Sequence, residues 1–199
     1  MKNINQKNYP DIPYITRQLC DNEADREKGK TTTISSSGCG LCSAIMVADR
    51  LIPNCEFGLE DAVNISYESN ANVKIGTDYQ RFAPAFAEKL GLDFEKTNDP
   101  ERLRYCLRTG GAAVLHMKGD RDGHIGVFSN GGHYIAAISE ERDGRIATMD
   151  PSFRPDKYDK EGRKGHVEIT NGVITLTNMQ VLIDDSAPAP YSFYLFWRK

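Results

Sequence analysis

The chain has 199 residues, of which 39% are hydrophobic and 27% are charged, and its formal net charge is −3. This composition is typical of one globular domain, and a weakly acidic chain is not expected to bind nucleic acid or an anionic membrane surface. No apolar run approaches the ~18 residues of a membrane span, and the first ten residues contain no signal-peptide core. We therefore predict a cytoplasmic protein with reduced thiols.

Residues 1–35 form a polar segment at the start of the chain. They contain Pro10, Pro13 and the charged run "DNEADREKGK" at 21–30. Prolines punctuate regular structure, and a run of charges is usually solvated. We therefore predict an extended arm followed by a long loop.

Four helices are predicted between residues 36 and 110. Ser36 and Ser37 are candidate N-caps for a helix that starts near Cys39, because hydroxyl oxygens accept from the free N–H groups at a helix start. Further apolar residues recur at helical spacing, which predicts three more helices. These patterns lie at 59–67, 79–90 and 103–107.

The second half of the chain changes to short apolar or alternating runs, which are typical of strands. Asp143-Gly144 and Asn171-Gly172 predict two β-hairpin turns. Helices followed by antiparallel strands indicate the α+β class. The predicted organisation is a single domain over 1–199, with an arm and loop at 1–35, a helical lobe at 36–110 and an antiparallel sheet lobe at 111–199. Six strands are expected at 112–117, 133–139, 145–150, 166–170, 173–177 and 191–197.

Cys39 lies in "SSSGCG", at the predicted start of the first helix. The helix dipole and the free N–H groups there stabilise a thiolate, and the same N–H groups can stabilise an oxyanion. Gly38 and Gly40 allow a substrate backbone to come close. From these features alone, a nucleophile and an inert buried cysteine are equally good interpretations. Cys42, one turn further on, is interpreted as an apolar packing residue.

Cys39 and Cys42 together form a C-x-x-C sequence, which raises two other interpretations. A thioredoxin-like dithiol needs a βαβ context, whereas "GKTTTISSSG" precedes this sequence. A structural zinc site needs two more ligands, and Cys20, Cys55 and Cys106 are scattered singly. We therefore expect neither a metal nor a cofactor.

His133 is the histidine best placed to act as a base. It follows two glycines and starts an apolar run, so a rigid strand can present it to a cleft. Asp150 ends the next predicted strand, and antiparallel pairing of this hairpin brings Asp150 beside His133. A carboxylate there fixes the tautomer of the imidazole and favours its protonated form. His116 is interpreted as a core residue, His124 as a solvated loop residue and His166 as an exposed residue.

Taken in chain order, Gln18, "SSGCG" around Cys39, "GGHY" around His133 and "MDPS" around Asp150 resemble the motifs of papain-like cysteine peptidases. More narrowly, they resemble the double-glycine (bacteriocin-leader-processing) peptidase family and its stand-alone relatives, in which Pro-Thr takes the place of Leu41-Cys42. The resemblance implies a papain-like fold, whose helical lobe carries Cys39 as the nucleophile. It also implies His133 as the base, Asp150 as its orienting partner and Gln18 as an oxyanion donor.

The resulting hypothesis is a cysteine peptidase that cleaves a peptide or related amide bond through an acyl-enzyme, with a peptide or protein as its substrate. Water, or another amine, would resolve the acyl-enzyme. Two alternatives stay open. One is a non-catalytic peptide-binding module that keeps a papain-like cleft, and the other is a thiol oxidoreductase that uses Cys39 and Cys42.

Overall fold

The computed structural model describes residues 2–16, 30–73, 76–186 and 190–199. Its helices are η1 (Gln6–Asn8), α2 (Ile34–Ser37), α3 (Cys39–Leu51), α4 (Leu59–Glu68), α5 (Tyr79–Leu90), α6 (Pro100–Arg108) and α7 (Met179–Ser186). Its strands are β1 (Pro13–Thr16), β2 (Lys30–Thr33), β3 (Asn72–Val73), β4 (Gly76–Thr77), β5 (Leu92–Thr97), β6 (Ala112–Met117), β7 (His133–Glu140), β8 (Ile146–Met149), β9 (Val167–Thr170), β10 (Ile174–Thr177) and β11 (Phe193–Arg198).

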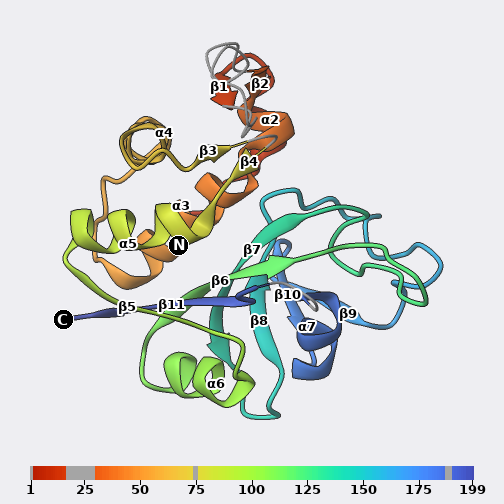
Figure 1. Cartoon of the computed structure of the whole chain (residues 1–199). Coiled ribbons are helices and arrows are strands. Elements are labelled where there is room, and N and C mark those ends of the chain that lie inside the picture. The colour runs from red at the N-terminus through yellow and green to blue at the C-terminus, as the bar shows by residue number, and fades with distance from the viewer. Residues whose placement is uncertain (1, 17–29, 74–75, 187–189) are drawn as a thin grey trace.

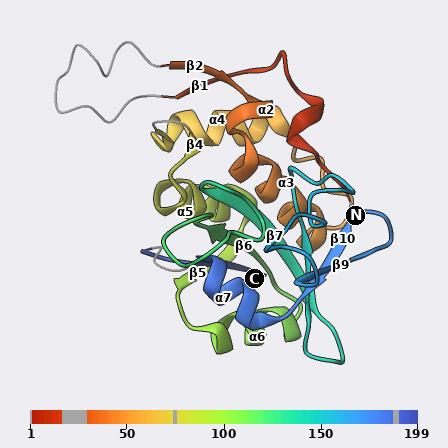
Figure 2. The ribbon, with the colours of Figure 1, turned by 90° about the vertical axis from the view of Figure 1, so that its right-hand side faces the viewer.

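Seven strands form one large sheet in the order β5-β11-β6-β7-β8-β10-β9, and every neighbouring pair is antiparallel. β1 pairs with β2, and β3 with β4, in two small separate ribbons. The large sheet has α3, α4 and α5 on one side and α6 and α7 on the other (Figures 1 and 2). The predicted mixture of helices with a large antiparallel sheet is therefore confirmed.

The central strands of the sheet are buried on both faces. Val114 and Ala136 belong to the core shared with α3, α4 and α5, whereas their neighbours Leu115 and Ile135 belong to the core shared with α6 and α7. Successive side chains of a strand point to opposite faces, so a strand covered on both sides is apolar throughout. This explains why "AAVLHM" and "HYIAAIS" are continuous rather than alternating apolar runs.

Helix α3 is the most deeply enclosed helix near the sheet. Every residue from position 40 to 48 is buried, and the helix packs against β6 and β7. A helix that is apolar on all sides needs cover all round, and here α4, α5 and the sheet supply it. The first residue of this helix is therefore held in a fixed place relative to the strands.

Several segments differ from the sequence-based expectation. β5 lies inside the predicted helical lobe at 36–110 but pairs with β11 at one edge of the large sheet. α7 was not predicted, and part of the predicted arm pairs as the β1–β2 ribbon. Ser36 and Ser37 do not cap α3, because they belong to the short helix α2, and Gly38 is the N-cap. Within the described ranges, no helix combines the length and apolar character that crossing a bilayer requires.

Candidate active site

Close packing of two glycines fixes the start of α3. A Cβ atom on Gly38 would lie 2.7 Å from both the Cγ2 and the carbonyl oxygen of Ile34, so only glycine fits where α2 meets α3. A Cβ atom on Gly40 would lie 2.8 Å from the ring of Tyr79, whose hydroxyl donates to the Gly40 carbonyl at 2.6 Å. These contacts place the thiol of Cys39 at the helix N-terminus, where backbone N–H groups are free.

Cys39 is a half-buried residue, and its thiol interacts with the imidazole of His133, the first residue of β7. Burial opposes ionisation of the thiol, but the bond to His133 and its positive charge more than offset it. The backbone N–H groups of Tyr134 and Gly40 act in the same direction, so the net effect of these surroundings is to lower the pKa of Cys39. The arrangement favours a thiolate–imidazolium pair.

Asp150 holds the other side of the His133 ring. Nε2 of His133 lies 2.8 Å from Oδ1 of Asp150, which leaves Nδ1 as the ring nitrogen available to the thiol. Burial by itself would lower the pKa of His133, since only 5% of the residue is exposed, but the carboxylate of Asp150 raises it to about 9. The imidazole is therefore protonated at neutral pH, and its positive charge favours ionisation of the thiol.

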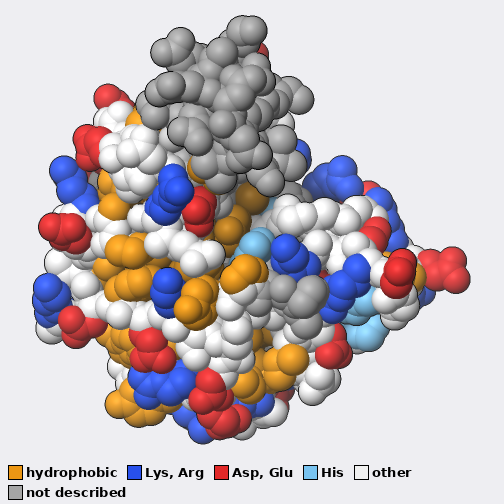
Figure 3. All heavy atoms as spheres, in the orientation of Figure 1, with side chains coloured by type: hydrophobic (Ala, Val, Ile, Leu, Met, Phe, Trp, Pro, Cys, Tyr) orange, Lys and Arg blue, Asp and Glu red, His pale blue; other side chains and the backbone are white. Residues whose placement is uncertain are grey.

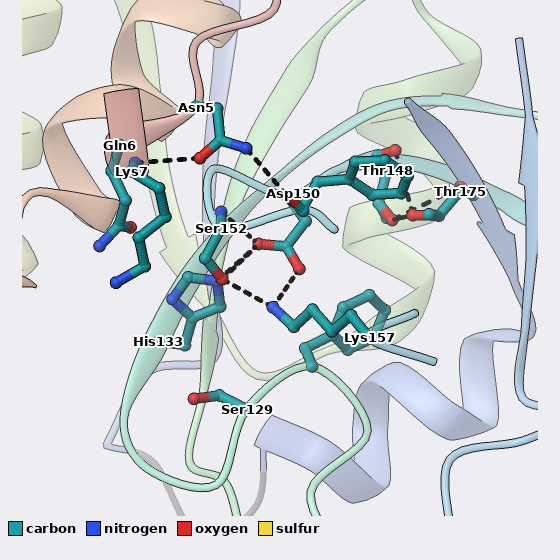
Figure 4. A network of polar contacts seen from close by, with 12 residues as sticks. Asn5, Gln6, Lys7, Ser129, His133, Thr148, Asp150, Ser152, Lys157 and Thr175 are labelled. Carbon is teal, nitrogen blue, oxygen red and sulfur yellow. Dashed lines mark hydrogen bonds and ion pairs between the residues drawn. The ribbon is translucent and has the colours of Figure 1, made fainter. Parts of the chain in front are cut away.

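Asp150 is itself surrounded by donors from the loop that follows it. Only 1% of the residue is exposed. Its Oδ1 accepts from the backbone N–H of Ser152 at 2.8 Å, and its Oδ2 accepts from the Tyr158 hydroxyl at 2.7 Å and from the Lys157 ammonium. Figure 4 shows His133 and Lys157 approaching the carboxylate from different sides. Burial alone would raise the pKa of Asp150, but the two cations hold it well below its usual range.

The sequence analysis singled out Cys39, His133 and Asp150, which the structure brings together, but it did not single out Ser152, Lys157 and Tyr158. These three occur in "DPSFRPDKY", directly after Asp150, where turns fold the chain back on the carboxylate. A lysine and a tyrosine follow the end of a buried strand within a few residues of sequence. That short separation is the signal that could have suggested them. Spacing alone does not give the loop conformation that brings them together.

The N-terminal segment braces this loop. The Asn5 side chain, which lies near Asp150 in Figure 4, donates to the carbonyl oxygen of Phe153 at 2.8 Å. The backbone N–H of Gln6 donates to the carbonyl oxygen of Pro151 at 2.7 Å. Gln18, the predicted oxyanion donor, lies outside the described residues, as does Cys20.

Cys42 differs from Cys39 in every respect that matters for reactivity. It is fully buried, and burial raises the pKa of its thiol well above the ordinary value. Cys39, Cys42, Cys55 and Cys106 are all free thiols. No three His, Cys, Asp or Glu side chains in the described part of the chain converge as a metal site would require.

A second histidine–carboxylate pair lies away from Cys39. The interpretation of His124 as a solvated loop residue is wrong, because its Nε2 lies 2.9 Å from Oδ1 of Asp185, a fully buried residue of α7. Asp185 also accepts from the backbone N–H groups of Val127 and Phe128, at 2.7 and 3.0 Å. The pair ties the loop between β6 and β7 to α7.

Comparison with known proteins bears on the fold. No protein-family model matches this sequence, and no curated protein is significantly similar to it. Among solved structures, the chain is similar to a crystal structure from Bacillus anthracis described as a C39-like peptidase. The two chains are 11% identical with a TM-score of 0.51, and the match covers 100% of this chain and 98% of the other. This likeness shows that the chain has a fold of the C39-like peptidase kind.

Proposed function

We propose that this protein is a cysteine peptidase of papain-like type, with Cys39 as nucleophile, His133 as general base and acid, and Asp150 as the group that orients His133. The observation that carries the proposal is the buried hydrogen bond between His133 and Asp150, together with the interaction of that imidazole with the Cys39 thiol at a helix N-terminus. The similarity in fold to a C39-like peptidase supports it. A structural cysteine needs none of these contacts.

In the proposed reaction the Cys39 thiolate attacks the carbonyl carbon of the scissile bond. The oxyanion that forms is stabilised by the backbone N–H of Cys39 and by the side-chain amide of Gln18. His133 gives its proton to the leaving amine, which leaves an acyl-enzyme. His133 then takes a proton from water, the hydroxide attacks the thioester, and the thiolate departs, so the imidazolium–thiolate pair is restored.

The proposed substrate is a peptide or protein, in keeping with the bacteriocin-leader-processing resemblance of the sequence. On the face shown in Figure 3, histidine and hydrophobic surface lie side by side, and acidic and basic side chains are interspersed around them. A face with no single dominant charge suits a polypeptide better than a polyanion.

The test is covalent capture of Cys39 by a peptide vinyl sulfone, located by mass spectrometry of proteolytic fragments. We expect one adduct on Cys39 in the folded protein, blocked by prior iodoacetamide, and strongly slowed adduct formation in His133→Ala. Hydrolysis of a mixed peptide library is measured in parallel. A folded protein that forms no adduct and cleaves no peptide would favour the binding-module alternative.

The oxidoreductase alternative makes a different prediction for the same protein. A dithiol enzyme needs Cys42 and does not need His133, so insulin reduction would survive His133→Ala and be lost in Cys42→Ala. The peptidase proposal predicts the opposite pattern for peptide cleavage.

A further inference from the structure

Lys157 is a buried lysine directed at the carboxylate that holds His133. Only 5% of the residue is exposed, and its ammonium donates to Oδ2 of Asp150 and, at 2.7 Å, to the hydroxyl of Ser152. Burying an ammonium group is costly unless it is paired, and an ion pair of this kind is weak support for stability by itself. Its place in the fold therefore calls for another explanation.

The two oxygens of Asp150 are divided between two cations. Oδ1 is bound by the imidazole of His133 at 2.8 Å, while Oδ2 is bound by Lys157 and by the Tyr158 hydroxyl at 2.7 Å. Ser152 links the two sides, because its hydroxyl lies 3.1 Å from Oδ1 of Asp150 and 3.2 Å from Nε2 of His133. One carboxylate thus serves an imidazolium and an ammonium at once.

We propose that Lys157 is a positioning residue of this site, which offsets the charge of Asp150 so that the carboxylate orients His133 without trapping the imidazole in its protonated form. The inference rests on the proposed function, in which His133 must give up a proton and recover it in each cycle. With Lys157 charged, the thiolate, the imidazolium, the carboxylate and the ammonium sum to zero. Without it, the same buried chain carries one net negative charge.

The sign of the effect follows from the charges. A positive charge beyond Asp150 disfavours the imidazolium and favours the thiolate, so Lys157 lowers the pKa of both His133 and Cys39. Loss of the Lys157 charge should raise both pKa values. A role confined to folding would move neither of them in the folded protein.

Other charged or titratable groups act on Cys39, His133, Asp150 and Lys157. Among the described residues these groups include His116 on β6, Arg154 and Arg163 in the loop, and Tyr158, Tyr134, Tyr79, Tyr14 and Cys42. Burial raises the pKa of the tyrosines and of Cys42, so they stay neutral. Burial, helped by nearby positive charge, lowers the pKa of His116 to about 4, so it is uncharged at neutral pH.

The experiment compares three variants of the full chain: Lys157→Gln, Lys157→Arg and Tyr158→Phe. Two titrations are recorded, namely the pH dependence of iodoacetamide alkylation at Cys39 and the NMR titration of the His133 ring. We expect Lys157→Gln to move both toward alkaline pH by about one to two units, the size expected for a charge roughly 6 to 10 Å away at an effective dielectric near 20. Lys157→Arg keeps the charge and should restore both.

Tyr158→Phe is the matched control. It removes a hydrogen bond from the same carboxylate oxygen without changing a charge, so it should leave the His133 titration within about 0.3 pH units of the unaltered protein. Equal shifts in Tyr158→Phe and Lys157→Gln would overturn the proposal, and so would unshifted titrations in a folded Lys157→Gln protein.

A second measurement needs no variant. Burial lowers the pKa of Lys157 and the charge of Asp150 opposes that shift. The proposal requires that Lys157 keep its proton across the pH range in which His133 titrates, which NMR titration of the Lys157 side chain measures, and deprotonation within that range would overturn the proposal. None of these titrations requires a substrate. A protein that cleaves no peptide but shows the Lys157 shifts therefore contradicts only the proposed function, whereas an active peptidase without the shifts contradicts only the role of Lys157.

Discussion

Two histidine–aspartate pairs occur in this protein, and they are alike at first sight. His133 binds Asp150 at 2.8 Å and His124 binds Asp185 at 2.9 Å, each through Nε2 and Oδ1. Both carboxylates are buried; Asp150 also accepts from one backbone N–H group and Asp185 from two. The geometry of the pair alone does not tell a reactive site from a structural one.

The difference lies in what each pair contacts next. Beyond His133 lies the thiol of Cys39 at the start of a helix, and beyond Asp150 lies the buried Lys157. Asp185 instead binds the N–H groups of Val127 and Phe128, which fixes the path of a loop. A histidine–aspartate pair can therefore simply hold two segments together. It becomes a candidate for catalysis when a nucleophile lies beside the histidine.

The largest expected effect separates the two histidines by activity. We expect His133→Ala to lower the rate of peptide cleavage per folded molecule by at least about 10³-fold, as loss of a triad base does. His124→Ala should leave that rate within about threefold, since its ring has no contact with the thiol. Steady-state hydrolysis of one peptide by both variants measures the difference, and equal losses would contradict the distinction.

The next effect separates the two aspartates by stability. Asp185→Ala leaves two buried backbone N–H groups without their acceptor, so we expect it to lower the free energy of unfolding by about 3 kcal/mol. Urea denaturation measures the loss. The alkylation rate of Cys39 in the folded fraction should be unchanged, and a tenfold drop in that rate would show that the loop clip and the thiol site are coupled.

The third prediction concerns pH and the two members of the ion pair. The pKa of His133 is raised from 6.5 to about 9, so its contribution to stability is full below pH 6.5 and is lost as the pH rises through 9. The pKa of Cys39 is lowered from 9.0, so its contribution is full above pH 9 and is lost as the pH falls through the lowered value. Where both groups titrate below pH 9 the two contributions have opposite slopes, so we expect a weaker net pH dependence of stability than His133 alone would give.

Cys39→Ala breaks that compensation. The imidazole contribution then stands alone, so the free energy of unfolding should fall by on the order of 1 kcal/mol as the pH rises through the pKa of His133. That pKa should itself be lower than in the unaltered protein, because the thiolate no longer stabilises the imidazolium. A denaturation series across pH 6–10 tests both points, and identical pH profiles for the two proteins would count against an ion pair.

The smallest effect concerns the helix start, which only the Cys39 site possesses. Tyr79→Phe removes the hydrogen bond to the Gly40 carbonyl while keeping the ring, and we expect it to cost about 1 kcal/mol of stability. A slower alkylation of Cys39, by no more than about tenfold, should accompany the loosened helix start. An unchanged thermal midpoint would show that packing around the ring, rather than the hydroxyl, fixes Gly40.

Much of this arrangement is visible in the sequence because it depends on local patterns. The apolar spacing predicted α3 to α6, and the Asp143-Gly144 turn predicted the β7–β8 hairpin that carries His133 and leads to Asp150. The side chains of His133 and Asp150 form the hydrogen bond that the hairpin suggested, although their catalytic roles remain predictions. A hairpin needs only a turn signal and two apolar runs, so short-range sequence specifies it.

Other features depend on tertiary contacts that no local pattern encodes. β5 has only a short apolar alternation, at Leu92 and Phe94, and it becomes a strand because it pairs with β11, about a hundred residues later. Likewise, Lys157 appears from sequence to be one more charge in a polar loop. It is buried only because the loop turns back over Asp150, and spacing does not predict that turn.

The packing of α3 on the sheet affects the reactivity of the chain before folding is complete. Cys39 belongs to the helical layer and His133 to the sheet, and the two are brought together only when those layers have docked. An incompletely folded chain would carry an ordinary, protonated thiol with no base beside it. Newly made or damaged chains would therefore not cleave their own exposed peptide bonds. The reactive thiolate would form only when folding is complete.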